Sequence, residues 1–293
     1  MASSRGLLTV VLAIMTLTWT LAAQKTPSIK IAVDIVQIPV TVSNAANRIV
    51  TGLGRERFRI WEDRTEQKIA YFSTEDAPLS LVIVLDTSGS MGPVIRGANR
   101  SAAECLKTGN LHDWYSLVLF SSKPEPPTEF TSDIRVLQKK LLSVNSKGTT
   151  ALYDAAHSGL VQLEKATTPR KAMVVISDGY ENHSRHSAGD LKKMVREKDV
   201  QIYTIGNSGD GAIRELTQTT GGTALRIPGA DSLANVCSAI VREMKNQYVI
   251  SYKSTNTAKD GSWRKIRVEL NVPKQFQLTA RAKTGYFAGT EED

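Results

Sequence analysis

Short apolar runs alternate with amphipathic stretches of helical length between Leu79 and Asn246. Runs such as LSLVIVLD, WYSLVLF, KAMVVIS and VQIYTIG are apolar on both faces, which is typical of strands in a parallel sheet covered on both sides. The amphipathic stretches lie at 93–107, 134–144, 151–166, 188–198, 211–220 and 232–246. With weaker edge strands at PPTEFTS and GTALRIP, the pattern predicts an α/β fold, a doubly wound and mostly parallel six-stranded sheet.

The segments on either side show a different pattern. Residues 24–78 and 247–293 carry short β-branched or alternating runs such as DIVQIPVTV and WRKIRVEL, separated by turn-rich stretches, before a polar EED tail. Each segment alone is too short to bury a two-layer core. We therefore predict that the two β segments pair into one small β-sandwich-like domain, and that residues 79–246 are a domain inserted between its halves.

The first residues predict the compartment. Residues 1–23 hold one arginine, then an uncharged apolar stretch that ends in two alanines, which is the pattern of a secretory signal peptide. An uncleaved anchor is the weaker alternative, because the stretch is short and contains four threonines. We expect a secreted or periplasmic protein, which would contact a membrane only if this segment stayed uncleaved.

Composition excludes several classes of protein. Hydrophobic residues make up 41% and charged residues 23%, as in ordinary globular proteins. Two cysteines are too few for a disulfide scaffold or an unaided iron–sulfur cluster. The net charge is +8, but Lys and Arg are spread along the chain without a dense run, so no nucleic-acid partner is predicted. Export also removes cytosolic nucleotides from the expected ligands, so no nucleotide is predicted.

Three loops at the carboxyl ends of predicted strands carry hydroxyl and carboxylate side chains. DTSGS places Asp86, Ser88 and Ser90 directly after the first core strand, GTT contributes Thr150, and SDG contributes Asp178. In an open parallel sheet the loops that follow the strands form the binding crevice. Oxygen ligands suit Mg²⁺, Mn²⁺ or Ca²⁺ and do not suit zinc. The pattern therefore predicts a site for a hard divalent cation at one sheet edge.

DTSGS, GTTALYDA and SDG resemble, in order, spacing and strand context, the three parts of the metal-ion-dependent adhesion site of von Willebrand factor type A (VWA) domains. The resemblance covers residues 79–246 and implies Mg²⁺, or Mn²⁺ or Ca²⁺, as the cofactor. The flanking segments resemble those of a group of exported VWA proteins from Acidobacteria.

The resemblance also implies a role for each matched residue. The hydroxyls are expected to contact the ion directly, and the two carboxylates directly or through water. Thr149 is the alternative to Thr150. The implied ligand set is Asp86, Ser88, Ser90, Thr150 and Asp178.

Catalytic interpretations have weaker support. A nucleophile at Ser90 would call for Gly-x-Ser-x-Gly, which is not present, and DTSGSMG matches neither common phosphate-binding loop. Metal-assisted hydrolysis would need a general base, and no spacing aims Glu181 or His183 at the site. His183 and His186 are expected to be solvated. We therefore predict that the protein is not an enzyme.

Two functional hypotheses follow from the ion. A divalent cation with an open position can take a carboxylate from a protein ligand as its last ligand, which predicts an exported, metal-dependent protein-binding module of the adhesion type. The alternative is a structural or assembly component of an envelope complex, in which the metal is only stabilising. Chelation would abolish binding in the first case and lower thermal stability in the second.

The two cysteines lie on the apolar faces of predicted helices. Cys105 shares its face with Ala98 and Ala102, and Cys237 shares its face with Ile240 and Met244. The VWA resemblance implies that the first and last helices lie side by side, which makes a Cys105–Cys237 disulfide possible. Two separate buried thiols are the alternative, because free cysteine is often buried.

Overall fold

The structure is a computed structural model that describes residues 35–74, 76–178, 181–206, 211–226 and 233–290. The predicted signal peptide, residues 1–23, and the polar tail lie outside the described residues. In the described part, no helix has the length and hydrophobicity needed to cross a membrane.

A parallel sheet of five strands, in the order β6-β5-β7-β8-β9, forms the centre of the α/β domain. The strands are β5 (Leu79–Asp86), β6 (Trp114–Phe120), β7 (Arg170–Ile176), β8 (Gln201–Ile205) and β9 (Ala224–Leu225). Every residue of β5 is buried, and neighbouring residues such as Leu81 and Val82 belong to cores on opposite faces of the sheet. The run that is apolar on both faces therefore lies inside the sheet, as predicted.

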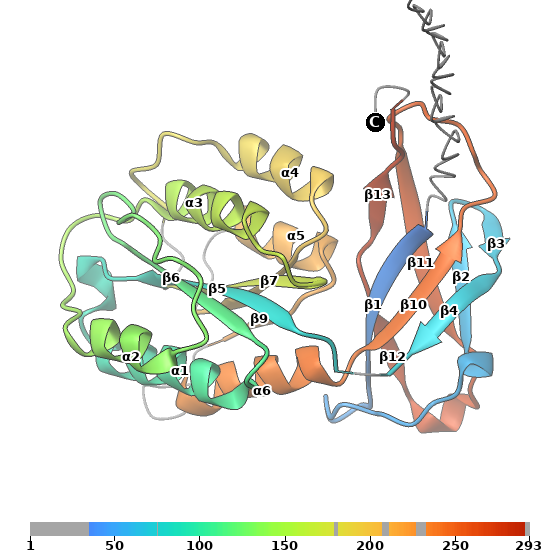
Figure 1. Cartoon of the computed structure of the whole chain (residues 1–293), viewed down its shortest axis with the longest axis horizontal. Helices are drawn as coiled ribbons and strands as arrows, with labels where there is room; N and C mark the ends of the chain where they lie inside the picture. The colour runs from blue at the N-terminus through green and yellow to red at the C-terminus, as the bar shows by residue number, and fades with distance from the viewer. Residues whose placement is uncertain (1–34, 75, 179–180, 207–210, 227–232, 291–293) are drawn as a thin grey trace, which may run out of the picture. The chain divides into compact units, whose positions relative to one another are not determined.

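Helices cover both faces of this sheet (Figure 1). The core on one face includes residues of α1, α2 and α6, and the core on the other face includes residues of α3, α4 and α5. These helices overlap all six predicted helical stretches. Their bounds are α1 (Ile95–Thr108), α2 (Ile134–Leu142), α3 (Leu152–Glu164), α4 (Ala188–Glu197), α5 (Gly211–Thr219) and α6 (Leu233–Lys245).

The sheet has five strands in the described residues, where six were predicted. The segment PPTEFTS lies antiparallel beside the edge strand β6, and Thr131 exchanges two 2.9 Å backbone hydrogen bonds with Tyr115. The contacts with β6 are isolated bridges, because Pro124, Pro126 and Pro127 have no N–H to donate to a continuous ladder. The predicted sixth strand is therefore a bridged edge segment.

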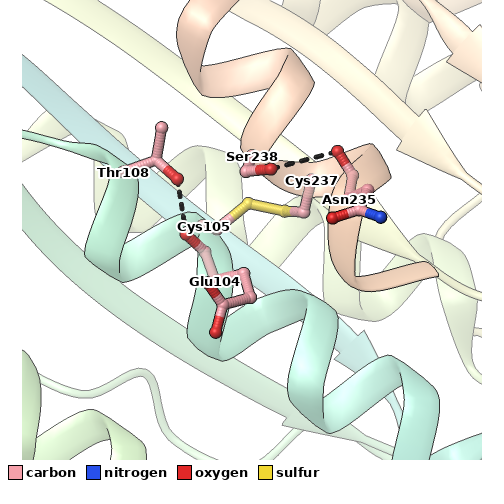
Figure 2. Close-up of a disulfide and its surroundings, with 6 residues drawn as sticks. All are labelled: Glu104, Cys105, Thr108, Asn235, Cys237 and Ser238. Carbon is pink, nitrogen blue, oxygen red and sulfur yellow. Dashed lines mark hydrogen bonds between the residues drawn. A yellow bond between two sulfur atoms is a disulfide. The ribbon is translucent and has the colours of Figure 1, made fainter. Parts of the chain in front are cut away.

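Helices α1 and α6 are joined by a disulfide between Cys105 and Cys237 (Figure 2). The two Cα atoms lie 5.1 Å apart, and neither cysteine has exposed surface. Both belong to the core beneath the same face of the sheet. The covalent link connects residues 132 positions apart in sequence, so it ties the beginning of the α/β domain to its end.

Two four-stranded antiparallel sheets form the β domain, in the orders β12-β1-β10-β4 and β13-β11-β2-β3. Four strands precede the α/β domain: β1 (Ile35–Ser43), β2 (Phe58–Glu62), β3 (Thr65–Gln67) and β4 (Ile69–Ser73). Four follow it: β10 (Tyr248–Lys253), β11 (Trp263–Leu270), β12 (Thr279–Arg281) and β13 (Gly285–Phe287). Each sheet combines strands from both flanks, because β1 pairs with β10 and β2 pairs with β11. The predicted fold class is confirmed.

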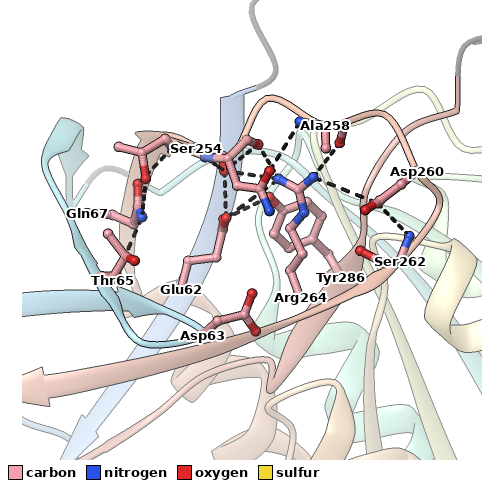
Figure 3. Close-up of polar contacts among 12 residues, drawn as sticks. Glu62, Asp63, Thr65, Gln67, Ser254, Ala258, Asp260, Ser262, Arg264 and Tyr286 are labelled. Carbon is pink, nitrogen blue, oxygen red and sulfur yellow. Dashed lines mark hydrogen bonds and ion pairs between the residues drawn. The ribbon is translucent and has the colours of Figure 1, made fainter.

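The β domain contains a buried polar cluster around Glu62 (Figure 3). The Glu62 carboxylate accepts hydrogen bonds from Tyr252 (2.7 Å), Tyr286 (2.8 Å) and Ser254 (2.6 Å). The guanidinium of Arg264, which is 3% exposed, lies 3.6 Å from the same carboxylate. A buried charge needs such partners, so this cluster fixes β2, β10, β11 and β13 relative to one another.

A second polar network lies where the chain passes between the two domains. Lys245, at the end of α6, lies 2.7 Å from Asp113 and 3.1 Å from Asp76. Arg170, at the start of β7, donates a 3.0 Å hydrogen bond to Gln247. Gln247 in turn donates to a threonine hydroxyl on β1. The two chain segments that connect the domains are therefore held at the end of the parallel sheet where β5 and β7 begin.

Candidate functional site

The first loop of the candidate site begins at the carboxyl end of β5. Asp86 has no exposed surface, and its two carboxylate oxygens accept hydrogen bonds from the backbone N–H of Ser88 (2.8 Å) and from the hydroxyl of Ser177 (2.6 Å). The hydroxyl oxygens of Ser88 and Ser90 lie 3.0 Å apart. Ser88 is 1% exposed and Ser90 is exposed. The loop therefore places one hydroxyl in the interior and a neighbouring one at the surface.

The second loop, residues 146–150, is bound to the first by backbone hydrogen bonds. Gly89 N–H donates to Gly148 O (3.0 Å), and Lys147 N–H donates to Thr87 O (2.8 Å). Gly148 has a φ of +83°, a conformation that favours glycine. Thr150, at the end of this loop, is 2% exposed. The first and second loops therefore form one joined structure.

The position of Thr149 separates the two threonine candidates. Its backbone N–H and its hydroxyl both donate to the hydroxyl oxygen of Ser122, at 3.0 and 2.9 Å. The hydroxyl of Thr149 is therefore already bonded to Ser122, which follows β6, on the exposed side of the loop. This geometry favours Thr150 over Thr149 as a candidate ligand.

The third loop follows β7 and carries Asp178. The oxygen Oδ1 of Asp178 is buried and accepts no hydrogen bond from the residues that the structure describes. A buried polar atom without a partner lowers the stability of the folded protein. A bound cation is a partner of the required kind.

Two carboxylates share this edge of the sheet. Burial is the main cause that raises the pKa of Asp86, the charge of Asp178 adds to the increase, and hydrogen bonds from Ser177 and Ser88 oppose it. Two neighbouring acidic groups repel each other. A divalent cation between them would remove that repulsion.

The residues present fit a hard cation. Within the described part of the chain, no group of three or more His, Cys, Asp or Glu side chains is arranged to hold a metal ion. The predicted set is of another kind, with two carboxylates and three neutral hydroxyls. Oxygen-only donors of this kind suit Mg²⁺, Mn²⁺ or Ca²⁺.

Residues 81–181 match the family model of the von Willebrand factor type A domain. The chain contains a VWA domain. The match includes all three loops described above, from Asp86 to Asp178. A search of curated proteins found no match.

A solved structure shows the same fold, and two further solved structures are similar to the α/β domain. A von Willebrand factor type A protein from Catenulispora acidiphila is 12% identical, with a TM-score of 0.51 over 87% of this chain and 74% of that chain. That share of this chain exceeds the VWA domain alone. The conserved hypothetical protein BatB from Bacteroides thetaiotaomicron is 19% identical, with a TM-score of 0.48 over 57% of this chain and 98% of that chain. The vWF domain of the type V pili tip protein Mfa5 from Porphyromonas gingivalis is 15% identical, with a TM-score of 0.45 over 57% and 95%.

One prediction about the loops of the VWA domain holds only in part, since the side chain of His186 is 34% exposed and makes specific contacts. His186 was expected to be solvated, but its Nδ1 lies 2.6 Å from Oδ1 of the buried Asp154, and its ring stacks on His157 with centroids 3.9 Å apart. The cause is Asp154 in the first turn of α3. Its carboxylate also accepts hydrogen bonds from the backbone N–H groups of Arg185 and His186. His183 is exposed, as predicted.

The structure also shows polar residues that sequence reasoning did not assign to the site. The hydroxyl of Ser177 donates a hydrogen bond to Asp86, and the side chain of Asn182 accepts one from the backbone N–H of Thr150. Ser177 is the residue before Asp178 in the SDG motif, so its place at the end of β7 was a usable signal. Asn182 offered none, because its partner lies 32 residues away in sequence.

Proposed function

We propose that the VWA domain binds a divalent cation, Mg²⁺ or else Mn²⁺ or Ca²⁺, and uses it to bind another protein. Three loops carry two carboxylates and three hydroxyls at one sheet edge. The observation that carries the proposal is the buried Oδ1 of Asp178, which has no partner among the described residues. The residues that would hold the ion are Asp86, Ser88, Ser90, Thr150 and Asp178.

The bound ion would supply an electrophilic position for an acidic side chain of the partner. The exposed hydroxyl of Ser90 lies at the surface side of the loop, while Asp86 and Ser88 are buried beneath it. An approaching carboxylate would therefore reach the ion from the Ser90 side. The net charge of +8 favours encounter with acidic partners.

We propose a binding role and no catalysis. Glu181, a candidate general base, accepts hydrogen bonds from the backbone of Tyr153 (2.9 Å), His183 (2.8 Å) and Ser184 (2.7 Å). Burial opposes ionisation of Glu181, but the hydrogen bonds outweigh it and lower its pKa. A carboxylate held in this way stabilises loop structure and is a poor proton acceptor at neutral pH.

We also propose a compartment, on the basis of the first residues. The signal-peptide pattern at 1–23 supports secretion or export to the periplasm, and the module would act at the cell envelope or outside it. The resemblance of the flanking segments to exported VWA proteins of Acidobacteria stays a prediction.

The test is metal-dependent capture of a partner. The exported protein, immobilised, is exposed to envelope and medium fractions with Mg²⁺ or with EDTA, beside Asp86→Asn and the control Asp133→Asn. Asp133 is the N-cap of α2 with a side chain that is 43% exposed, and asparagine caps helices equally well. Capture by wild type and the control in Mg²⁺ only, and none by Asp86→Asn, supports the proposal. Capture that EDTA leaves unchanged, together with a lower melting temperature in EDTA, supports the structural or assembly role instead.

A further inference from the structure

The N-terminus of α3 is capped by a segment about 30 residues further along the chain. Ala151, the N-cap residue, makes no side-chain cap hydrogen bond. The backbone N–H of Tyr153 donates to Glu181 (2.9 Å), and that of Asp154 donates to the hydroxyl of Ser184 (3.0 Å). The first N–H groups of a helix have no partner within the helix, so the segment 181–186 satisfies them.

Asn182 extends this capping to Thr150. Its side-chain Oδ1 accepts a 3.0 Å hydrogen bond from Thr150 N–H, and its own N–H donates a 3.1 Å hydrogen bond to Thr150 O. The peptide groups on both sides of the Thr150 side chain are thus held by one residue. Thr150 itself is 2% exposed, so its hydroxyl has little freedom once its backbone is fixed.

The pairing joins the second and third loops of the site. Backbone hydrogen bonds from Gly89 and Lys147 already join the second loop to the first. Asn182 lies four residues after Asp178, so its contact with Thr150 brings the loop of one proposed ligand against another. Ligands that are held in place before the ion arrives bind it more tightly, and residues that orient ligands typically contribute 10–100-fold to metal affinity.

We propose that Asn182 is a positioning residue for the metal site: it sets Thr150 relative to Asp178 through the two hydrogen bonds between the second and third loops. The inference rests on the proposed function, since it assigns a role toward the same ion. Asn182 does not contact the ion in this proposal. It acts through the backbone of Thr150.

The chain offers a matched control for this role. Asn182→Ala removes the acceptor for Thr150 N–H, and Ser184→Ala removes the acceptor for Asp154 N–H at the same helix terminus. The bond lost in Asn182→Ala lies just before the N-cap of α3, while Ser184→Ala loses a capping bond within the first turn together with the 2.7 Å hydrogen bond from its hydroxyl to Glu181. Only Asn182→Ala changes the support of a proposed ligand.

The experiment is a titration of the full exported chain with Mn²⁺ by isothermal calorimetry, together with the melting temperature in EDTA. We expect both variants to melt below wild type in EDTA, and Asn182→Ala alone to bind Mn²⁺ about tenfold or more weakly. Asn182→Asp keeps an acceptor for Thr150 and should retain binding at least as tight as wild type.

Three results would overturn the inference. Wild-type affinity in Asn182→Ala shows that Thr150 needs no such support. An equal loss of affinity in Ser184→Ala shows a general effect of capping on α3. A wild-type chain that binds no Mn²⁺ overturns the proposed function and this inference with it, and that result is seen before any variant is compared.

Discussion

The ammonium group of Lys245 lies 2.7 Å from the carboxylate of Asp113, a residue with no exposed surface. The same carboxylate accepts hydrogen bonds from the backbone N–H groups of Leu79 (3.0 Å) and Asn110 (2.8 Å). One buried charge therefore joins the end of α6 to the beginning of β5. Both are points where the chain enters or leaves the α/β domain.

Loss of Lys245 should destabilise the protein strongly. Lys245→Met leaves Asp113 buried without its cation, which typically costs about 3–5 kcal/mol. Guanidinium unfolding at neutral pH measures the change. Lys107→Met is the control, because Lys107 forms an exposed pair with Glu104 (2.7 Å) and should lose at most about 1 kcal/mol. Similar small losses in both variants would contradict the assigned importance of Asp113.

Asp178→Asn should separate metal binding from stability. Without metal, removal of one charge near Asp86 relieves repulsion and should raise the free energy of unfolding. Wild type should gain about 2.7 kcal/mol in Mg²⁺ at 100 times the dissociation constant, and the variant much less. Thermal unfolding in Mg²⁺ and in EDTA measures both effects. A variant that still gains as much as wild type would exclude Asp178 as a ligand.

The disulfide between Cys105 and Cys237 should contribute strongly to stability. The double variant Cys105→Ala, Cys237→Ala should lose about 2–5 kcal/mol, and dithiothreitol should destabilise wild type but leave the double variant unchanged. Peptide mapping without reduction identifies the bridge directly. Two freely alkylated cysteines in the unfolded, unreduced chain would show that no bridge forms.

If the bridge restrains α6, mild reduction should change affinity for the partner more than affinity for Mg²⁺. The bridge lies within α1 and α6, and the proposed ligands lie in the three loops at the sheet edge. Calorimetry with Mg²⁺ and binding to the captured partner, each with and without reductant, compare the two. Equal changes in both affinities would contradict the prediction.

Stability should fall as the solution becomes mildly acidic, and His157 should account for part of the fall. Burial is the main cause that lowers the pKa of His157, and His186 adds to it, against the charges of Asp154, Asp190 and Glu164. The unfolded chain then binds the proton more readily, near pH 6.5, so the free energy of unfolding decreases as pH falls through that value.

His157→Gln should flatten this dependence between about pH 7 and pH 5. Urea unfolding at a series of pH values measures the slope, and His112→Gln, at an exposed position, should leave it unchanged. An unaltered slope in His157→Gln would assign the acid sensitivity to other groups.

Below about pH 5 a second loss of stability is expected, from Asp154. Burial alone would raise the pKa of Asp154, but hydrogen bonds from His186 and Arg185 lower it to about 2. Its stabilising effect is complete above about pH 4 and is lost as pH falls toward 2.

The amino-terminal β segment should not fold alone. Residues 24–78 supply β1, whose partner β10 comes from the other flank through register pairs such as Ile38 with Ile250. The fragment should therefore be unfolded or aggregate, and circular dichroism on heating tests it. A cooperative melt would contradict the split β domain. The domain boundaries 24–78, 79–246 and 247–293 stay predictions that such fragments also test.

The fold was largely predictable because its signals are local. The run at β5 is apolar at every position, and amphipathic periodicity marks each helix within a few residues. Asp86, Ser88 and Asp178 also follow strand ends, and the topology of a parallel sheet brings such positions together. The prediction of a sixth strand was wrong for a local reason as well. The prolines near Thr128 have no N–H to donate to a continuous β ladder.

The unpredicted features depend on pairings between distant segments. Asn182 contacts Thr150, and His186 stacks on His157, only because the third loop lies over the first turn of α3. No periodicity in either segment encodes that register. Lys245 is likewise an ordinary basic residue at a helix end until its partner, 132 positions earlier at Asp113, is known.

The placement of the α/β domain between β4 and β10 has a mechanical consequence. These two strands are hydrogen-bonded neighbours, with Ser73 opposite Val249, so the chain leaves and re-enters the β domain at adjacent points. A tensile force applied across the β domain, from β1 to β13, would first load the ladders that β1 makes with β10 and β12 and that β13 makes with β11. The VWA domain would carry no tension until β4 and β10 separate. An adhesive contact made through the proposed metal site would therefore keep its geometry while the rest of the chain is stretched.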